Sequence, residues 1–228
     1  MLRDLLSVWF PQSCWNCKQP LLTTQKWLCV RCAAQLPKTY FEKEQNNALF
    51  IMLRQHLALE TAYAPFYFLQ HSPIQVLLHA LKYQGKEQID DWMAQLTAEL
   101  IPKNHPMLQC DGIVPVPLHP SRERKRGYNQ ITKFGHYWAN RLNVPYLDHV
   151  LLRKNQTKTL VHMSREARWK EVKDAFSIQT QQTYKHLLLV DDVITTGATL
   201  TACGSSLLNG VCDKISVLGM AYAQNILP

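Results

Sequence analysis

The sequence has no apolar run long enough to cross a bilayer, which argues against a membrane-spanning helix. Its N-terminal segment also lacks the long apolar region and the small-residue cleavage site of a secretory signal. No internal repeat and no low-complexity stretch occurs, so nothing indicates a repeat protein. We therefore expect a globular protein that is located in the cytoplasm and is not inserted into a membrane.

Acidic residues are few relative to basic ones. The chain of 228 residues contains 17 Asp and Glu against 25 Lys and Arg, which gives a formal net charge of +8. Such an excess favours polyanionic ligands such as nucleic acid or a pyrophosphorylated sugar, although a merely soluble basic surface has the same composition. A chain of this length buries one core with at most a small appendage, and 46% apolar residues are ordinary for a globular protein.

The nine histidines show no metal-ligand spacing, but four of the seven cysteines do. Two C-x-x-C pairs, Cys14 with Cys17 and Cys29 with Cys32, are separated by eleven residues. Four thiolates complete a tetrahedral zinc shell and leave no open coordination position, so we predict a structural zinc ion. Disulfides or free thiols are the alternative. The odd number of remaining cysteines and the expected reducing compartment argue against disulfides.

A second group of chemically informative residues follows an apolar run at 187–190, which predicts a strand buried on both faces. Asp191 and Asp192 stand where we expect that strand to end, and a hydroxyl-rich turn with Gly197 comes after them. Apolar residues then recur at helical spacing: Leu200, Leu207 and Leu208. In an open α/β sheet, ligands bind beyond the carboxyl ends of the strands, so this segment indicates a binding site.

The chemistry of this segment suits a phosphorylated sugar. A helix N-terminus offers unpaired N–H groups and the positive end of a dipole, and both attract phosphate. Gly197 allows close approach of the backbone, and hydroxyl donors come from Thr195, Thr196 and Thr199. Two ionised carboxylates accept hydrogen bonds from a vicinal diol. The segment therefore matches a ribose 5-phosphate, although aspartates that simply cap an ordinary helix are the alternative.

Residues 114–130 carry a second signal for anion binding. Repeated prolines stiffen the exit from a predicted strand, and the loop that follows has four cations within five residues. Gly127 permits an unusual turn before a helix begins near Asn129. We interpret this loop as a rigid anion-binding element at the same sheet edge as Asp191, and a solvated basic loop is the alternative.

Elsewhere the sequence alternates strands with helices, which predicts an α/β fold with a mostly parallel sheet. The expected strands are residues 62–69, 112–116, 149–152, 187–190 and 215–221. The expected helices begin at Ser72-Pro73, span residues 89–101 and 129–142, and follow Gly197. A polar linker divides the chain into an N-terminal zinc ribbon, residues 1–40, and a second domain, residues 41–228.

Residues 187–199 resemble the phosphoribosyl-pyrophosphate signature of type I phosphoribosyltransferases. The resemblance implies a sheet of that family's kind. It also implies that Asp191 and Asp192 are catalytic residues that hold the ribose hydroxyls, neither acting as a general base. The 5-phosphate is then held by the turn: Thr195, Thr196, Gly197, Ala198 and Thr199. Mg²⁺ is implied as the partner of the pyrophosphate.

Residues 114–130 and the cysteine pairs resemble the competence protein F family, which joins a zinc ribbon to a phosphoribosyltransferase domain. Lys82-Tyr83-Gln84-Gly85 matches another motif of that family, although Lys82 also fits an ordinary helix C-terminus. Leu160 and Glu171 depart from the Gln and Asn common there. The resemblance implies further residues that bind phosphoribosyl pyrophosphate: Lys82, Arg122, Arg126, Gly127, Arg153 and Arg168.

The resemblance implies a role in natural transformation and DNA uptake, with single-stranded DNA and competence proteins (a helicase and a recombination mediator) as partners. Phosphoribosyl pyrophosphate remains an expected ligand because a pure DNA surface has no use for adjacent carboxylates. The alternative is a catalytically active phosphoribosyltransferase. No segment of the sequence indicates its acceptor.

Overall fold

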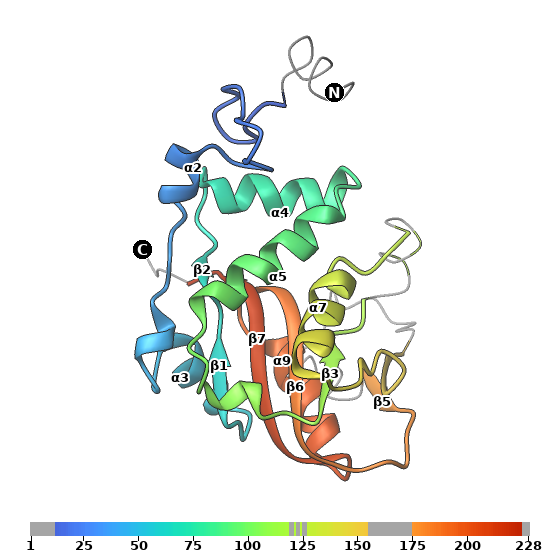
Figure 1. Cartoon of the computed structure of the whole chain (residues 1–228). Coiled ribbons are helices and arrows are strands. Elements are labelled where there is room, and N and C mark those ends of the chain that lie inside the picture. The colour runs from blue at the N-terminus through green and yellow to red at the C-terminus, as the bar shows by residue number, and fades with distance from the viewer. Residues whose placement is uncertain (1–11, 119–120, 122–123, 125–126, 155–174, 225–228) are drawn as a thin grey trace, which may run out of the picture.

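The computed structural model describes residues 12–118, 121, 124, 127–154 and 175–224, and its centre is a parallel sheet (Figure 1). The strand order is β1–β7–β6–β3, with β2 also paired to β7. The strands are β1 (Thr61–Tyr63), β2 (Phe66–Tyr67), β3 (Gly112–Pro115), β6 (Tyr184–Ile194) and β7 (Cys212–Tyr222). All of their pairings are parallel, which confirms the predicted α/β class with a mostly parallel sheet.

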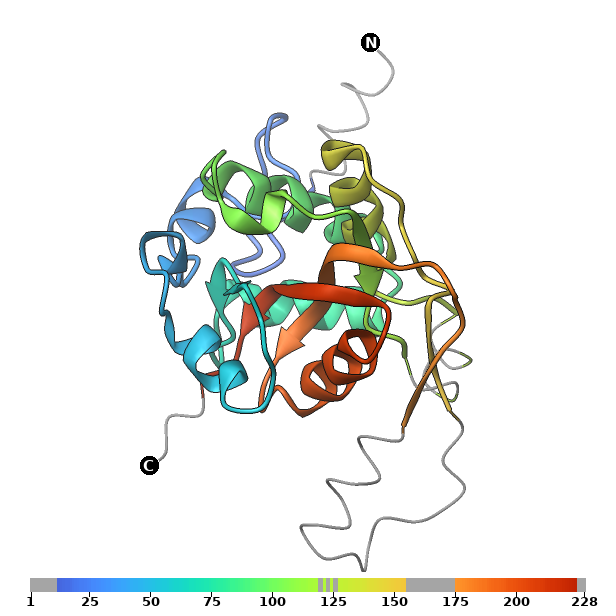
Figure 2. The ribbon, with the colours of Figure 1, turned by 90° about the horizontal axis from the view of Figure 1, so that it is seen from below.

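Helices cover both faces of this sheet, as Figures 1 and 2 show from two directions. One face carries α5 (Gln88–Leu100) and α7 (Thr132–Leu142), and the other carries α9 (Ala198–Leu208) and α3 (Ala48–Arg54). A fifth helix, α4 (Pro73–Tyr83), crosses the edge at which the strands end. Because both faces are covered, the middle of β6 is fully buried from Leu187 to Val190.

Helix α4 begins where the sequence predicts. The Ser72 hydroxyl accepts a hydrogen bond from the Gln75 backbone N–H at 3.4 Å, and Pro73 occupies the first turn. Its C-terminus is also as expected, since Gly85 follows with a φ of +64°.

Strand β6 is longer than predicted, because it continues through both acids to Ile194. Its pairing with β3 stops at Val190, but its pairing with β7 continues to the Ile194–Tyr222 pair. A partner strand on one side is thus enough to keep the backbone extended. The last predicted strand is present as β7, which lies between β1 and β6.

Three further elements differ from the sequence pattern. The aromatic strand predicted at 62–69 is split at Pro65 into β1 and β2, because proline donates no ladder hydrogen bond. The strand near 149–152 is β4 (Leu151–Arg153), which pairs antiparallel with β5 (Phe176–Ile178) in a separate small sheet. Helix α7 begins three residues later than expected.

Residues 12–36 form a small N-terminal module that lies next to α4 (Figure 1). The module contains the short helix α2 (Val30–Ala34), and a 3₁₀ turn, Phe41–Lys43, follows it. A second 3₁₀ turn, Pro106–Leu108, precedes β3. Within the described ranges, no helix has the length and apolar character needed to cross a membrane.

Candidate functional site

The turn between β6 and α9 forms a small cavity at the carboxyl end of the sheet. Its volume is about 50 Å³, and it is lined by Asp191 and by residues 193–200. Gly197 takes the left-handed backbone conformation, with a φ of +73°, directly before the first residue of α9. The N-terminus of α9 therefore opens into the cavity, together with the hydroxyl side chains predicted to hold a phosphate: Thr195, Thr196 and Thr199.

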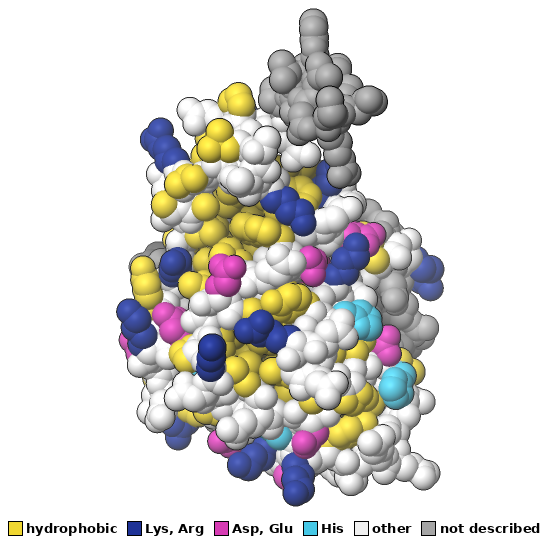
Figure 3. All heavy atoms as spheres, viewed as in Figure 1, with side chains coloured by type: hydrophobic (Ala, Val, Ile, Leu, Met, Phe, Trp, Pro, Cys, Tyr) yellow, Lys and Arg dark blue, Asp and Glu magenta, His cyan; other side chains and the backbone are white. Residues whose placement is uncertain are grey.

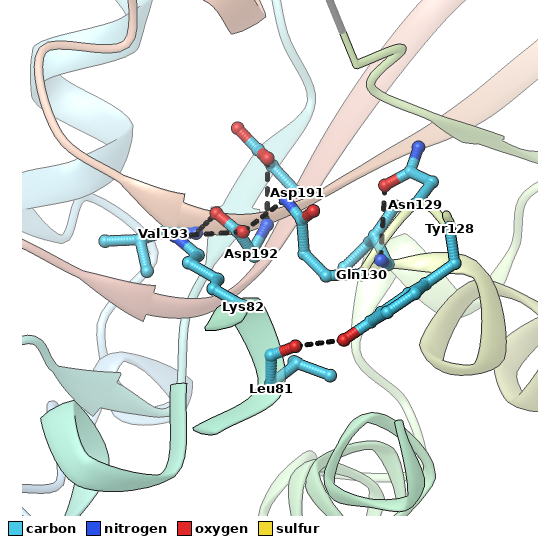
Figure 4. A network of polar contacts seen from close by, with 9 residues as sticks. Leu81, Lys82, Tyr128, Asn129, Gln130, Asp191, Asp192 and Val193 are labelled. Carbon is cyan, nitrogen blue, oxygen red and sulfur yellow. Dashed lines mark hydrogen bonds and ion pairs between the residues drawn. The ribbon is translucent and has the colours of Figure 1, made fainter. Parts of the chain in front are cut away.

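Asp192 lies on the other side of β6, in a buried network that Figure 4 shows. Its Oδ2 is 2.9 Å from the Lys82 Nζ of α4 and accepts a hydrogen bond of 2.5 Å from the Gln130 Nε2. Its other carboxylate oxygen accepts from the Val193 backbone N–H. Because only 5% of Asp192 is exposed, this carboxylate is held in place by a cation and an amide.

Asp191 points away from Lys82 in Figure 4, since neighbouring residues of a strand face opposite ways. Its Oδ1 accepts from the Asp192 backbone N–H at 2.8 Å, on a stretch of β6 that β3 no longer pairs. Burial, and next the charge of Asp192, raise the pKa of Asp191 to about 7. The two acids are adjacent in sequence, but Asp191 faces the phosphate-sized cavity while Asp192 is bound by protein groups.

Of the basic loop, the structure describes mainly the C-terminal end, from Gly127 onwards. Arg122, Arg126 and the later Arg168 lie outside the described residues, as do Leu160 and Glu171. Gly127 has a φ of +77°, the unusual turn that its position predicts. The following residues tie the loop to its surroundings: the Tyr128 hydroxyl donates to the Leu81 carbonyl, and the Asn129 side chain donates to the Val116 carbonyl.

Arg153 belongs to β4 and not to the main sheet. Its guanidinium lies 5.5 Å from the centre of the Phe176 ring. Its positive charge also acts on the buried thiol of Cys203 in α9, although burial dominates and raises the pKa of that thiol. Arg153 is therefore on the α9 side of the sheet, the same side as the cavity that Asp191 lines.

Two residues that support the site have no obvious signal in the sequence. Gln130 belongs to the motif at residues 114–130, but only the structure shows its role, which is to donate a hydrogen bond to Asp192. Asp90 is a buried acid whose two oxygens accept from the backbone N–H groups of Lys133 and Phe134, at 2.7 and 2.8 Å. Burial raises the pKa of Asp90 to about 8. Asp90 thus caps the N-terminus of α7, and that N-terminus follows Gln130 closely in the sequence.

The four predicted zinc ligands come together. The ligand atoms of Cys14, Cys17, Cys29 and Cys32 all lie within 4.8 Å of one another, and the Cys17 and Cys29 sulfurs are 3.6 Å apart. A tetrahedral zinc with bonds of about 2.3 Å places its sulfurs about 3.8 Å apart, so the cluster fits the ion.

Polar groups around the cluster support the same conclusion. The Cys29 backbone N–H donates to the Cys14 sulfur, and the Asn16 side chain donates to the Cys32 sulfur, both at 3.4 Å. Burial and the nearby thiols raise the pKa of Cys32 to about 12, whereas backbone N–H groups outweigh burial and lower that of Cys14 to about 6. Four thiols this close ionise together only with a cation among them.

No protein-family model matches the sequence. Among curated proteins, the chain is 28% identical to competence protein F of Haemophilus influenzae over 222 residues, 92% of this chain and 96% of that protein. It is also 28% identical to the DNA utilization protein YhgH of Escherichia coli K12 over 225 residues, 91% of this chain and 95% of that protein. The predicted resemblance to the competence protein F family is thereby confirmed over nearly the whole chain.

Two of the solved structures that match in shape are phosphoribosyltransferases. Orotate phosphoribosyltransferase from Aeropyrum pernix matches with a TM-score of 0.37 and 13% identity, over 65% of this chain and 66% of that one. Adenine phosphoribosyltransferase from Leishmania tarentolae matches with a TM-score of 0.38 and 12% identity, over 81% of this chain and 91% of that one. The resemblance to the family therefore rests on the sequence relatives and not on these structural matches.

Proposed function

We propose that this chain, which resembles competence protein F over nine-tenths of its length, is a DNA-uptake protein with a binding site for phosphoribosyl pyrophosphate. The observation that carries the binding site is the cavity where Asp191, the hydroxyl-rich turn and the N-terminus of α9 meet. That combination offers donors to a phosphate and an acceptor to a sugar hydroxyl.

The residues of the site divide into two roles in this proposal. Asp191 and the turn, residues 195–199, contact the ligand, and Lys82, Gln130 and Asp192 form the buried network behind it. Lys82 belongs to both groups, because its side chain is 21% exposed beside Asp192 and can also reach the pyrophosphate. Further contacts to the pyrophosphate come from the basic segments: Arg122, Arg126, Gly127, Arg153 and Arg168. Mg²⁺ bound with the ligand supplies charge neutralisation for the pyrophosphate.

The proposed biological role takes its support from the relatives, a competence protein and a DNA utilization protein. We place the chain in natural transformation, in the cytoplasm, with single-stranded DNA, a helicase and a recombination mediator as partners. The net charge of +8 supports a nucleic-acid partner. In this proposal residues 1–40 form a zinc ribbon with a structural ion, and residues 41–228 form the domain that binds the ligand.

A catalytically active phosphoribosyltransferase is the second candidate, favoured by the acid at the cavity. In that reaction a nucleophile bonds to the anomeric carbon of the ribose, and pyrophosphate leaves with the bonding electron pair. Positive charge builds on the sugar ring as the bond breaks, by analogy with glycoside cleavage. Release of pyrophosphate that depends on an added acceptor distinguishes this candidate from binding alone.

A thermal shift tests the binding site. Phosphoribosyl pyrophosphate with Mg²⁺, at a hundred times its dissociation constant, stabilises the fold by about 2.7 kcal/mol. We expect this shift in the wild type and in an exposed control, Asp148→Asn, but not in Asp191→Asn or in the Asp191→Asn/Asp192→Asn double variant. The absence of a shift in zinc-loaded, folded wild-type protein would overturn the proposed site.

A further inference from the structure

A groove lies between the N-terminal module and the end of α4. The residues that line it are far along the sequence from those of the proposed phosphoribosyl-pyrophosphate cavity. The volume of the groove is about 920 Å³, and residues from both sides line it. From the module come Gln12, Ser13, Trp15, Lys18, Lys26 and Trp27, and from the turn between α4 and α5 come Gln84, Lys86 and Gln88. The groove is thus formed by two segments about sixty residues apart, and folding alone brings them together.

Trp15 is the central aromatic residue of the groove. It packs edge to face against Trp27, with ring centres 5.8 Å apart. Trp15 also lines a second cavity of about 290 Å³ along α4. Close to that second cavity, His79 and Tyr83 form another ring pair at 4.8 Å, and Tyr83 is 63% exposed. Aromatic rings therefore line the groove, through Trp15 and Trp27, and the neighbouring second cavity, through Trp15 and His79.

Cations surround the same aromatic residue. The Nζ atoms of Lys18 and Lys86 each lie 5.9 Å from the centre of the Trp15 ring, one from the module and one from the α4–α5 turn. Lys26 adds a third ammonium group. Among the described residues that line this groove, every charged side chain is a lysine, and the remaining polar groups are mostly amides. The lining is complementary to an anion that also carries flat apolar groups.

Figure 3 shows hydrophobic side chains gathered below the N-terminal module on the face of Figure 1, with basic side chains at their margin. Single-stranded nucleic acids bind to this kind of surface, because bases stack on aromatic rings while phosphates meet cations. The groove is also at the upper end of the size range of small-molecule pockets and is open, which suits an extended chain better than one small ligand.

We propose that this groove binds single-stranded DNA, with a base stacked on Trp15 and the flanking phosphates held by Lys18 and Lys86. Gln84 and Gln88 offer amide groups that donate to and accept from base edges. The inference uses no residue of the β6–α9 turn. Binding of an oligonucleotide to the groove and of phosphoribosyl pyrophosphate to the cavity are thus separate measurements that succeed or fail independently.

The test is the affinity of the zinc-loaded full chain for a dye-labelled dT₁₂ oligonucleotide, measured by fluorescence anisotropy at several salt concentrations. We expect Trp15→Ala to weaken binding about 5- to 150-fold, the effect of losing one base–aromatic stack. Lys18→Ala/Lys86→Ala is expected to reduce the slope of log affinity against log salt by about 1.4, because each phosphate contact to a single strand contributes about 0.7.

The matched control is Tyr40→Ala/Lys43→Ala. It removes another aromatic–lysine pair, whose Nζ lies 5.0 Å from the ring centre and whose Tyr40 is 54% exposed, but which does not line the groove. We expect this variant to bind dT₁₂ as the wild type does. If Trp15→Ala loses zinc, its weaker binding could reflect misfolding. The proposal is then tested by the Lys18→Ala/Lys86→Ala variant and by Trp15→Phe, which keeps an aromatic ring for stacking.

Three outcomes would overturn the proposal. Unchanged dT₁₂ affinity and salt slope in the groove variants would place DNA binding elsewhere. Equal weakening by the Tyr40 and Lys43 control would indicate a general charge effect. Equally tight binding of a poly-glutamate peptide would show that the groove accepts any polyanion, and an acidic protein segment would then replace single-stranded DNA as its ligand.

Discussion

The Lys82 ammonium group lies 2.9 Å from the Asp192 carboxylate, and this ion pair joins α4 to the end of β6. Lys82 is 21% exposed and Asp192 is 7% exposed at their side chains. Removing the cation leaves a buried carboxylate with Gln130 as its remaining side-chain partner. We expect Lys82→Met to lower the free energy of unfolding by about 3 kcal/mol, measured by urea denaturation.

A double-mutant cycle separates this pair from general effects. Lys82→Met/Asp192→Asn removes both charges and should recover part of the lost stability. Lys133 supplies the control, because its ion pair with Glu87 has a similar length of 3.0 Å but is exposed at both ends. Lys133→Met is expected to cost under about 1 kcal/mol. Equal effects of the two lysine substitutions would contradict the importance of burial.

The pH dependence of stability should report the environment of Asp191. Its pKa is raised to about 7 in the folded protein, against about 3.9 for an unfolded aspartate. Between these values the folded state binds more protons than the unfolded state, so this carboxyl lowers stability as the pH rises. We expect Asp191→Asn to gain about 2–3 kcal/mol relative to the wild type between pH 5 and 8, most of it below pH 7, because one proton is worth about 1.4 kcal/mol per pH unit. Melting curves of both proteins, with Asp148→Asn as an exposed control, measure the gain. A constant difference across that range would refute the raised pKa.

Asp90 should be important for the stability of α7. Asp90→Ala leaves the N–H groups of Lys133 and Phe134 without their acceptors, and we expect a loss of about 3 kcal/mol. Asp90→Asn keeps one acceptor oxygen and should lose about half as much. Asp91→Ala, whose carboxylate has an exposed contact with Gln95, is the neighbouring control. If both alanine variants have the same unfolding midpoint, the capping role is wrong.

The cluster of four cysteines gives a prediction that can be tested without an activity assay. We expect about one zinc per chain by elemental analysis, and Cys17→Ser should reduce it to near zero and lower the melting temperature, because the module has little core without its metal. Cys110→Ala, a buried cysteine outside the cluster, should retain the ion. Zinc retained in Cys17→Ser would show that the four thiols are not all ligands.

Elements with local signals are the ones that the sequence predicts well. Ser72 and Pro73 set the start of α4 through neighbours within one turn, and the buried run at Leu187 identifies β6. The end of β6 has no such signal, because the strand is continued by β7, which follows it in the chain. Such boundaries depend on which distant segments pair with each other. This pairing cannot be predicted from the local pattern of a single sequence.

The same distinction holds for the candidate site. The sequence identifies Asp191, Asp192 and the turn as residues, but their separate environments follow from a strand that extends through both acids. Asp90 caps a helix more than forty residues later, so no local pattern marks it. The groove beside Trp15 likewise depends on two segments that meet only in the folded chain.

Gly197 should be intolerant of a side chain for two separable reasons. Its φ of +73° is unfavourable for other residues by about 1–2 kcal/mol, and a Cβ there would lie 2.4 Å from the Leu53 Cδ2 of α3. Gly85 has a similar φ of +64° with nothing within 4 Å of a Cβ, so Gly85→Ala measures the backbone effect alone. We expect Gly197→Ala to lose more stability than Gly85→Ala by urea denaturation.

The steric part of this effect has its own test. Leu53→Val in the Gly197→Ala background creates room for the new methyl group, so the two substitutions should cost less together than the sum of their separate costs. Because Gly197 lines the cavity, Gly197→Ala should also abolish the thermal shift with phosphoribosyl pyrophosphate, whereas Gly85→Ala should retain it. Additive costs would show that α3 moves aside freely. A retained ligand shift in Gly197→Ala would show that the turn binds phosphate without its close backbone approach.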